Sequence, residues 1–193
     1  MAFADFETRR LHCKVLYFGP RGAGKTTNLR AVLKHSSAEW QQNSSELTPV
    51  EYEDNPFFEF LPVSIGSVKE HHVKVHLYAF PPHRLYSTVY SVMLKGIDGM
   101  VFVADSAMDK LDDNLMAWQE TQDILAHEGI LMSHFPAVIQ YNKRDLKNAL
   151  PTEILRDQLN TLALPEIEAN ALNGTGVMQS LGNVVERFME QLA

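Results

Sequence analysis

The chain has 193 residues, of which 45% are apolar and 21% charged, values that are typical of a globular protein in water. A domain of this length buries roughly 70% of its unfolded surface, so its core needs no disulfide or metal for stability. The net charge of −7 argues against nonspecific nucleic-acid binding, which requires a basic face. Cys13 is the single cysteine, can form no internal disulfide, and lies in an apolar run that predicts a buried strand.

The sequence gives no sign of membrane insertion or lipid attachment. No basic-then-apolar leader is present, and no apolar run approaches the roughly 20 residues that a membrane helix needs. The first residues lack a glycine for myristoylation, and the last residues lack a cysteine for prenylation. We therefore expect a cytoplasmic protein with no direct membrane anchor, monomeric in the absence of partners.

Apolar strand-like runs alternate with helical patterns along the chain. This alternation predicts one α/β domain over residues 1–193, with a mostly parallel, six-stranded sheet and helices on both faces. The expected strands are 11–18, 57–65, 72–80, 99–105, 136–142 and 166–171. The expected helices are 25–36, 84–95, 110–127, 152–161 and 176–191. The last helix has the clearest pattern, with an apolar face formed by Val177, Leu181, Val184, Val185, Phe188 and Leu192.

Two stretches interrupt this alternation. Gly66-Ser67 predicts a hairpin turn between the second and third strands, which would make one edge strand antiparallel. Residues 37–56 show no periodicity and are rich in serine, glutamate and asparagine, so they predict a long loop that is functional or disordered.

Residues 19–27 read GPRGAGKTT and match the G-x-x-x-x-G-K-[ST] pattern between an expected strand and an expected helix. Glycines let successive backbone N–H groups surround a phosphate, and the helix start adds positive potential. Lys25 would reach the β- and γ-phosphates, and the Thr26 hydroxyl would ligate Mg²⁺. The expected nucleotide-contacting residues are Gly19, Gly22, Ala23, Gly24, Lys25, Thr26 and Thr27. Arg21 either offers a cation to the terminal phosphate or points to solvent, and the sequence leaves both open.

A second motif, Asn142-Lys143-Arg144-Asp145, follows an apolar strand. The Asp145 carboxylate can accept hydrogen bonds from the N1–H and the N2 amino group of guanine, a pair that adenine does not offer. The aliphatic stem of Lys143 can lie over the base. After a phosphate loop and at the carboxyl end of a strand, this motif predicts selection of guanine.

Together the two motifs resemble those of the Ras-like small GTPases. More narrowly, the chain resembles the bacterial gliding-motility GTPases of the MglA type over roughly residues 8–190, in the stretches YFGPRGAGKTTNL, FFEFLPVSIG, HLYAF, LKGIDGMVFVADS and VIQYNKRDLKNALP. The resemblance implies a Ras-like P-loop fold that binds GTP or GDP with Mg²⁺ and acts in cell polarity and motility. It also implies that Ala171 and Leu172 contact the base. Its implied partners are a roadblock-type activator and polarity proteins that bind the switch surface and recruit the protein to a cell pole.

The chain departs from the family pattern in both switches. The family has Pro-Gly-Gln where this chain has Pro81-Pro82-His83, and Pro82 lacks the N–H that would donate to the γ-phosphate. Asp54 stands at the position of the family's arginine finger, whose removal typically costs about 10³–10⁵ in rate. Asn55 stands at the position of the metal-sensing threonine, and Thr48 is the nearest upstream hydroxyl that a shifted register could bring to the metal.

These departures affect the γ-phosphate side, whereas the phosphate loop and the base motif persist. They favour a pseudo-GTPase, an interaction protein that holds a guanine nucleotide with slow or absent hydrolysis, for which Arg21 and His83 are the remaining catalytic candidates. The alternative is a competent GTP/GDP switch whose hydrolysis is completed by a partner activator. A P-loop kinase is disfavoured, because the NKRD motif has no place in one.

Overall fold

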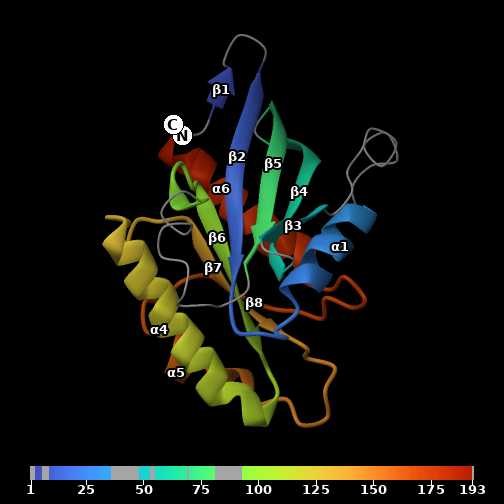
Figure 1. Cartoon of the computed structure of the whole chain (residues 1–193), viewed down its shortest axis with the longest axis vertical. Coiled ribbons are helices and arrows are strands. Elements are labelled where there is room, and N and C mark those ends of the chain that lie inside the picture. The colour runs from blue at the N-terminus through green and yellow to red at the C-terminus, as the bar shows by residue number, and fades with distance from the viewer. Residues whose placement is uncertain are drawn as a thin grey trace.

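The computed structural model describes residues 3–5, 9–35, 48–52, 55–68, 70–80 and 93–192. Strands in this part of the chain form one sheet in the order β3-β4-β5-β2-β6-β7-β8, with β1 beside β2 (Figure 1). The strands are β1 (Phe3–Asp5), β2 (Arg10–Phe18), β3 (Thr48–Tyr52), β4 (Asn55–Val68), β5 (His71–Ala79), β6 (Gly99–Asp105), β7 (Ala137–Asn142) and β8 (Glu166–Glu168). The helices are α1 (Lys25–His35), α4 (Leu111–His127), α5 (Thr152–Leu159), α6 (Val177–Gln191) and the short 3₁₀ helix η1 (Met108–Lys110).

The sheet is mostly parallel. β2 pairs in parallel with β5 and β6, and β7 pairs in parallel with β6 and β8. β4 runs antiparallel to β5, and the short strands β1 and β3 are antiparallel additions to β2 and β4. All six expected strands are present, and the expected α/β fold class is confirmed.

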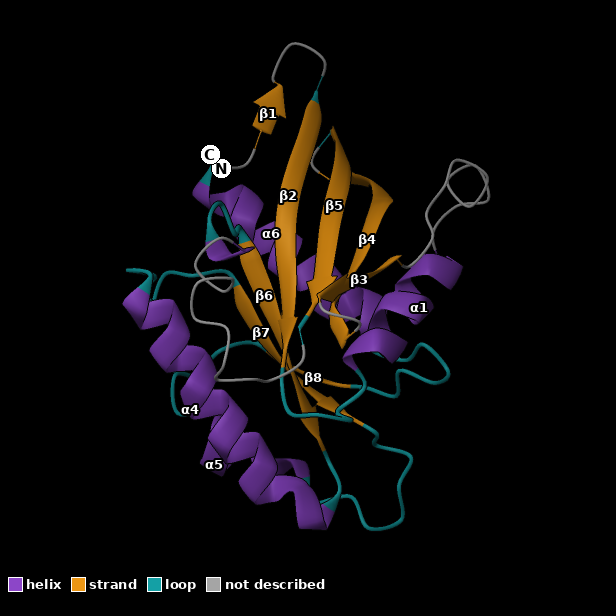
Figure 2. Ribbon diagram, viewed as in Figure 1, coloured by secondary structure: helices purple, strands orange, loops and turns teal. Residues whose placement is uncertain are grey.

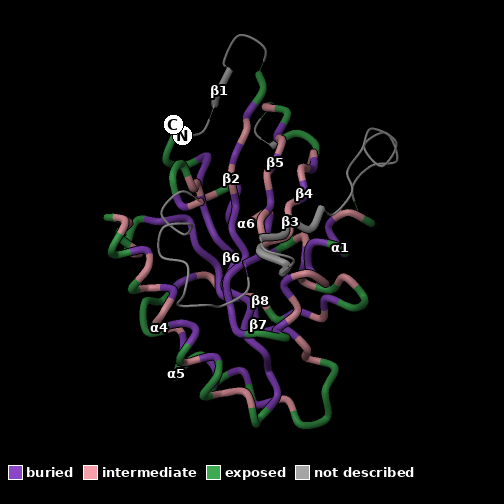
Figure 3. Tube along the Cα trace, viewed as in Figure 1, coloured by how far each residue is buried: buried purple, intermediate pink, exposed green. Residues whose placement is uncertain are grey.

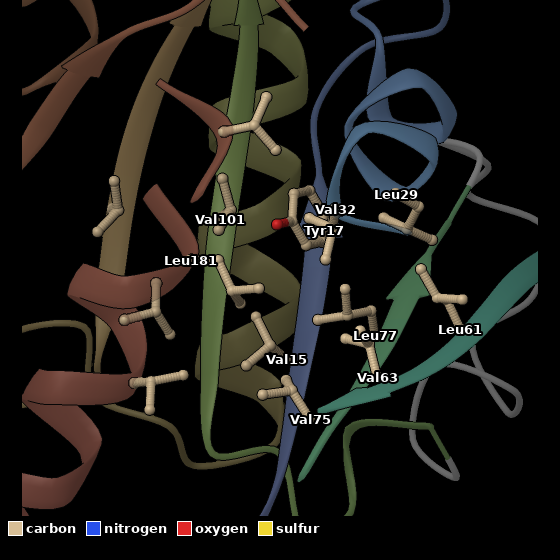
Figure 4. Close-up of a cluster of buried hydrophobic side chains, with 14 of the residues drawn as sticks. Val15, Tyr17, Leu29, Val32, Leu61, Val63, Val75, Leu77, Val101 and Leu181 are labelled. Atoms are coloured by element: carbon tan, nitrogen blue, oxygen red, sulfur yellow. The ribbon is translucent and has the colours of Figure 1, made fainter. Parts of the chain in front are cut away.

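Helices cover both faces of this sheet (Figure 2). On one face, α1 and α6 pack on the central strands through Leu29, Val32 and Leu181, which meet Val15 and Tyr17 of β2 (Figure 4). On the other face, Trp118 of α4 lies edge-on to Phe102 of β6, with ring centroids 4.7 Å apart. β6 and β7 are buried at every residue, whereas buried and half-buried residues alternate along most of β5 (Figure 3).

The structure corrects two expectations about the hairpin region. β4 continues through Gly66 to Val68, so Gly66-Ser67 lies within the strand, and the described turn residue before β5 is Glu70. Gly66 instead sits in a register shift between Ser64 and Ser67 with φ +91°. The stretch 37–56 is also not one long loop, because it contains all of β3 and the start of β4.

Three further expectations concern the helix over residues 84–95, the single cysteine and membrane-spanning helices. The expected helix 84–95 lies mostly outside the described residues, although residues 93–94 are helical. Cys13 is free and buried in β2, as predicted. None of the described helices combines the length and the apolar character that crossing a lipid bilayer requires.

Candidate functional site

The loop from Gly19 to Gly24 joins the carboxyl end of β2 to the first turn of α1, and two of its glycines are sterically required. A Cβ on Gly19, whose φ is +132°, would lie 2.1 Å from the carbonyl oxygen of Val103. A Cβ on Gly24, whose φ is +103°, would lie 2.4 Å from the side-chain nitrogen of Asn142. At these two positions the loop passes too close to neighbouring segments for a side chain. It leads into a helix start whose first N–H groups have no acceptor within the helix.

Lys25 opens α1 and is only 8% exposed. Its Nζ donates to the carbonyl oxygens of Gly19 and Pro20 at 2.7 and 2.8 Å, so the ammonium is held against the loop. Burial lowers the pKa of Lys25 from 10.5 to about 8, against the opposing effect of the Glu59 carboxylate. A buried ammonium at a helix start attracts a phosphate, because the negative charge of the phosphate would stabilise the ammonium that burial separates from water.

Asn142 connects three segments that are far apart in the sequence. Its side-chain Nδ2 donates to the carbonyl oxygen of Ala23 at 2.7 Å, and its Oδ1 accepts from the backbone N–H of Ala171 at 2.9 Å. The residue is 2% exposed, so both hydrogen bonds are shielded from water. Asn142 therefore fixes the positions of the phosphate loop, the NKRD motif and the loop at Ala171 relative to one another.

These three segments line one pocket. Its walls are formed by Gly22, Gly24, Thr27, Asn142, Lys143, Asp145, Leu146, Asn170, Ala171 and Leu172. The Asp145 side chain is exposed, and Leu172 is 80% exposed, so a carboxylate and an apolar side chain are both available to a ligand. A flat ring with hydrogen-bond donors on one edge, linked to a phosphate chain, matches this lining.

The two residues of the last loop predicted to contact the base have their backbone N–H groups hydrogen-bonded within the protein. Both Ala171 and Leu172 line the pocket, but the N–H of Ala171 already donates to Asn142. The N–H of Leu172 likewise donates to the Asn170 side chain at 3.1 Å. A base could use these donors only by competing for them, whereas the exposed Asp145 carboxylate lies in the same pocket lining.

The Lys143 ammonium forms an ion pair with a carboxylate at the end of the neighbouring strand β6. Its Nζ donates to Oδ2 of Asp105 at 2.6 Å, and Asp105 ends β6 directly beside Asn142 of β7. The backbone N–H and carbonyl of Asp105 are both bonded to the side chain of Asn114 in α4, at 2.8 and 2.7 Å. The lysine of the base motif is thus connected through Asp105 to α4.

The remaining candidates are less well placed or lie outside the description. Thr26 is half-buried in the first turn of α1, next to Lys25, whereas Arg21 is exposed on the loop, which favours its solvent-pointing interpretation. Thr48 and Asn55 pair through their backbones with Phe60 and Tyr52, but their side chains are not described. Asp54, Pro81, Pro82 and His83 lie outside the described residues.

Sequence reasoning missed two groups of polar residues near the site. One is the Asp105–Asn114 pair, and the other is a buried cluster in which Gln140 of β7 donates to Asn28 of α1 and to Ser180 of α6. A signal existed for each, because Asp105 ends an apolar strand and Gln140 interrupts another. The identity of their partners depends on how the strands are ordered in the sheet, which no local pattern gives.

Two comparisons with known proteins agree with this geometry. The sequence model of the ADP-ribosylation factor family matches residues 2–192. The chain is also 37% identical over 192 residues to the mutual gliding-motility protein MglA of Myxococcus xanthus (strain DK1622), an alignment that covers 100% of this chain and 98% of that protein. With a phosphate loop, a base motif and a mostly parallel sheet in the arrangement described, the chain belongs to the ADP-ribosylation factor family of Ras-like small GTPases and is of the MglA gliding-motility type.

Proposed function

We propose that this protein binds GTP and GDP with Mg²⁺ in the pocket described above and hydrolyses GTP slowly or not at all. Through protein partners on its switch surface it regulates cell polarity and motility, as the similarity to a gliding-motility protein suggests. The observation that carries nucleotide binding is the Asn142 bridge, which fixes the phosphate loop and the base loop around one pocket.

Each part of the nucleotide has a counterpart in this arrangement. The phosphates would lie at the start of α1, where Lys25 could exchange its two carbonyl partners for phosphate oxygens. The guanine edge would meet Asp145, and the stem of Lys143 would lie along the face of the base. Mg²⁺ usually takes one or two protein oxygens and completes its shell with phosphates and water, so the Thr26 hydroxyl fits that role.

Slow hydrolysis follows from residue chemistry in the two switches. Proline at position 82 cannot donate a backbone hydrogen bond to the γ-phosphate, whatever conformation the segment adopts. Asp54 adds negative charge where the family supplies an arginine, and charge develops on the phosphoryl oxygens in the transition state. The competent switch with an external activator remains the alternative, since an activator could supply the missing groups in trans.

Calorimetric titration of nucleotide-stripped protein tests the binding proposal. With Mg²⁺ present, GDP should bind and ADP should not, and Lys25→Ala should abolish GDP binding. Replacing the exposed Lys34 of the same helix by alanine is the matched control and should leave the affinity unchanged. Absence of GDP binding by the wild type, or equal affinity for ADP and GDP, would overturn the proposal.

A second titration with a non-hydrolysable GTP analogue separates the two hydrolysis hypotheses. Equal affinities for GDP and the analogue support a protein that no longer senses the γ-phosphate, because a ligand with equal affinity for two states shifts nothing between them. Clearly tighter binding of the analogue supports the competent switch.

The double variant Pro82→Gly with Asp54→Arg should raise phosphate release from GTP, and an unchanged rate would show that other positions limit hydrolysis.

A further inference from the structure

We propose that Asp105 is a positioning residue for the nucleotide base, because its carboxylate fixes the Lys143 side chain as one wall of the base pocket. This inference rests on the proposed guanine-nucleotide binding. It assigns a role to a residue that lies outside both nucleotide motifs.

Both oxygens of the Asp105 carboxylate accept a hydrogen bond. Oδ2 accepts from Nζ of Lys143 at 2.6 Å, and Oδ1 accepts from the backbone N–H of Ala107 at 3.1 Å. The Asp105 side chain is 4% exposed, whereas that of Lys143 is 34% exposed. The buried, doubly bonded carboxylate is therefore the fixed member of the pair, and the lysine is the member that it orients.

The backbone of Asp105 is hydrogen-bonded to a side chain of α4. The Asn114 side chain is fully buried, accepts from the N–H of Asp105 at 2.8 Å and donates to its carbonyl oxygen at 2.7 Å. The next residue, Ser106, donates its N–H to the carbonyl oxygen of Asn142 at 3.0 Å. Backbone position and carboxylate direction are thus both set before any ligand arrives.

The consequence for the base follows from the path of the Lys143 side chain. Lys143 has a φ of +65° and contributes to the lining of the pocket beside Asp145 and Leu172. With its ammonium attached to Asp105, its aliphatic stem has one orientation along that wall. An unattached lysine would sample many rotamers and would have to be ordered by the nucleotide, which weakens binding.

The variant Asp105→Asn tests this role with little change of shape. Asparagine keeps an oxygen for the N–H of Ala107 but loses the charge that holds Lys143. We expect the affinity for GDP to fall roughly tenfold or more, mainly through faster dissociation, as is typical when a charge-assisted hydrogen bond is lost. Inorganic pyrophosphate, which has no base, should bind the variant and the wild type equally.

Two further variants separate positioning from general stability. Asp113→Asn removes an exposed carboxylate of α4, paired with Lys110, and should leave GDP affinity within about twofold of the wild type. Lys143→Met keeps an unbranched stem without an ammonium and should lose affinity on its own. If Asp105 acts through Lys143, the double variant Asp105→Asn, Lys143→Met should bind GDP no more weakly than Lys143→Met alone.

The outcomes distinguish this inference from the proposal on which it rests. If the wild type binds no GDP, both fail together. If the wild type binds GDP and Asp105→Asn binds it equally well, only the positioning role fails. Equal losses for GDP and pyrophosphate, or additive losses in the double variant, would assign Asp105 a general structural role and likewise overturn the inference.

Discussion

Gln140 and Asn28 are 112 residues apart in the sequence, yet Nε2 of Gln140 donates to Oδ1 of Asn28 at 3.0 Å in the middle of the core. The same Nε2 donates to Oγ of Ser180 at 2.9 Å, and Nδ2 of Asn28 donates to the carbonyl oxygen of Gly24 at 3.0 Å. All three side chains are fully buried. The contact therefore connects the helix behind the phosphate loop to the last helix of the chain through β7.

Replacing Gln140 by leucine should destabilise the protein by roughly 1–3 kcal/mol, because the oxygens of Asn28 and Ser180 lose a buried donor. Urea unfolding without nucleotide measures the change. The control is Gln119→Leu, which removes an exposed glutamine bonded to Asp123 on α4 and should change the free energy of unfolding by less than about 0.5 kcal/mol. Equal effects of the two substitutions would show that the buried cluster contributes nothing specific.

Asn142→Ala should reduce both stability and GDP affinity. It removes the donor to Ala23 and the acceptor for Ala171, two shielded hydrogen bonds whose loss costs on the order of 1–3 kcal/mol each. It also releases the phosphate loop from the base loop, so the pocket walls lose their fixed spacing. Unfolding and GDP titration report the two effects, and the exposed Asn148, replaced by alanine, serves as control. Normal GDP affinity in Asn142→Ala would mean that the bridge does not organise the pocket.

The glycines of the phosphate loop allow a comparison of two backbone positions. Gly24 and Gly22 both have positive φ, +103° and +80°, so alanine is strained at either. Only at Gly24 would the added Cβ meet another group, the side-chain nitrogen of Asn142 at 2.4 Å, whereas nothing lies within 4 Å at Gly22. Gly24→Ala should therefore weaken GDP binding more than Gly22→Ala, and the reverse order in a GDP titration would contradict this geometry.

Local patterns predicted the fold well where one element buries one face. The apolar face from Val177 to Leu192 predicted a helix over 176–191, and α6 spans Val177–Gln191. They failed where pairing between strands overrides a local signal. Gly66 is typical of a turn, yet β4 continues past it because the strand pairs with β5 on both sides of a register shift. β3 was not expected, because residues 37–56 show no periodicity. Its Pro49 is tolerated because β3 lies at the edge of the sheet.

In the site too, features carried by adjacent residues could be predicted, whereas contacts between distant residues could not. The phosphate loop and NKRD could be predicted because each motif is contiguous and carries its chemistry in adjacent residues. The contact between Asp105 and Lys143 could not, because it depends on β6 and β7 being neighbours in register, with Asp105 opposite Asn142. A carboxylate at the end of an otherwise apolar strand can be read from the sequence as a polar group at the carboxyl edge of the sheet, but the residue that it contacts cannot.

The buried ammonium of Lys25 predicts a pH dependence of folding. Its pKa is lowered by burial from 10.5 to about 8, so the unfolded chain binds more protons than the folded protein between these two values. The contribution of Lys25 to stability therefore rises with pH across that window and is lost as pH falls through about 8, where the folded protein must hold a buried charge. Lys25→Met removes this titration and keeps an unbranched side chain in the same space.

Urea unfolding of wild type and Lys25→Met at several pH values between about 7 and about 10 isolates the contribution of Lys25, since other groups titrate in both proteins. The free energy of unfolding of the wild type should rise relative to that of the variant by on the order of 1–3 kcal/mol over this range. Replacing exposed Lys34 by methionine should give a profile parallel to that of the wild type. Parallel profiles for wild type and Lys25→Met would contradict a lowered pKa of Lys25.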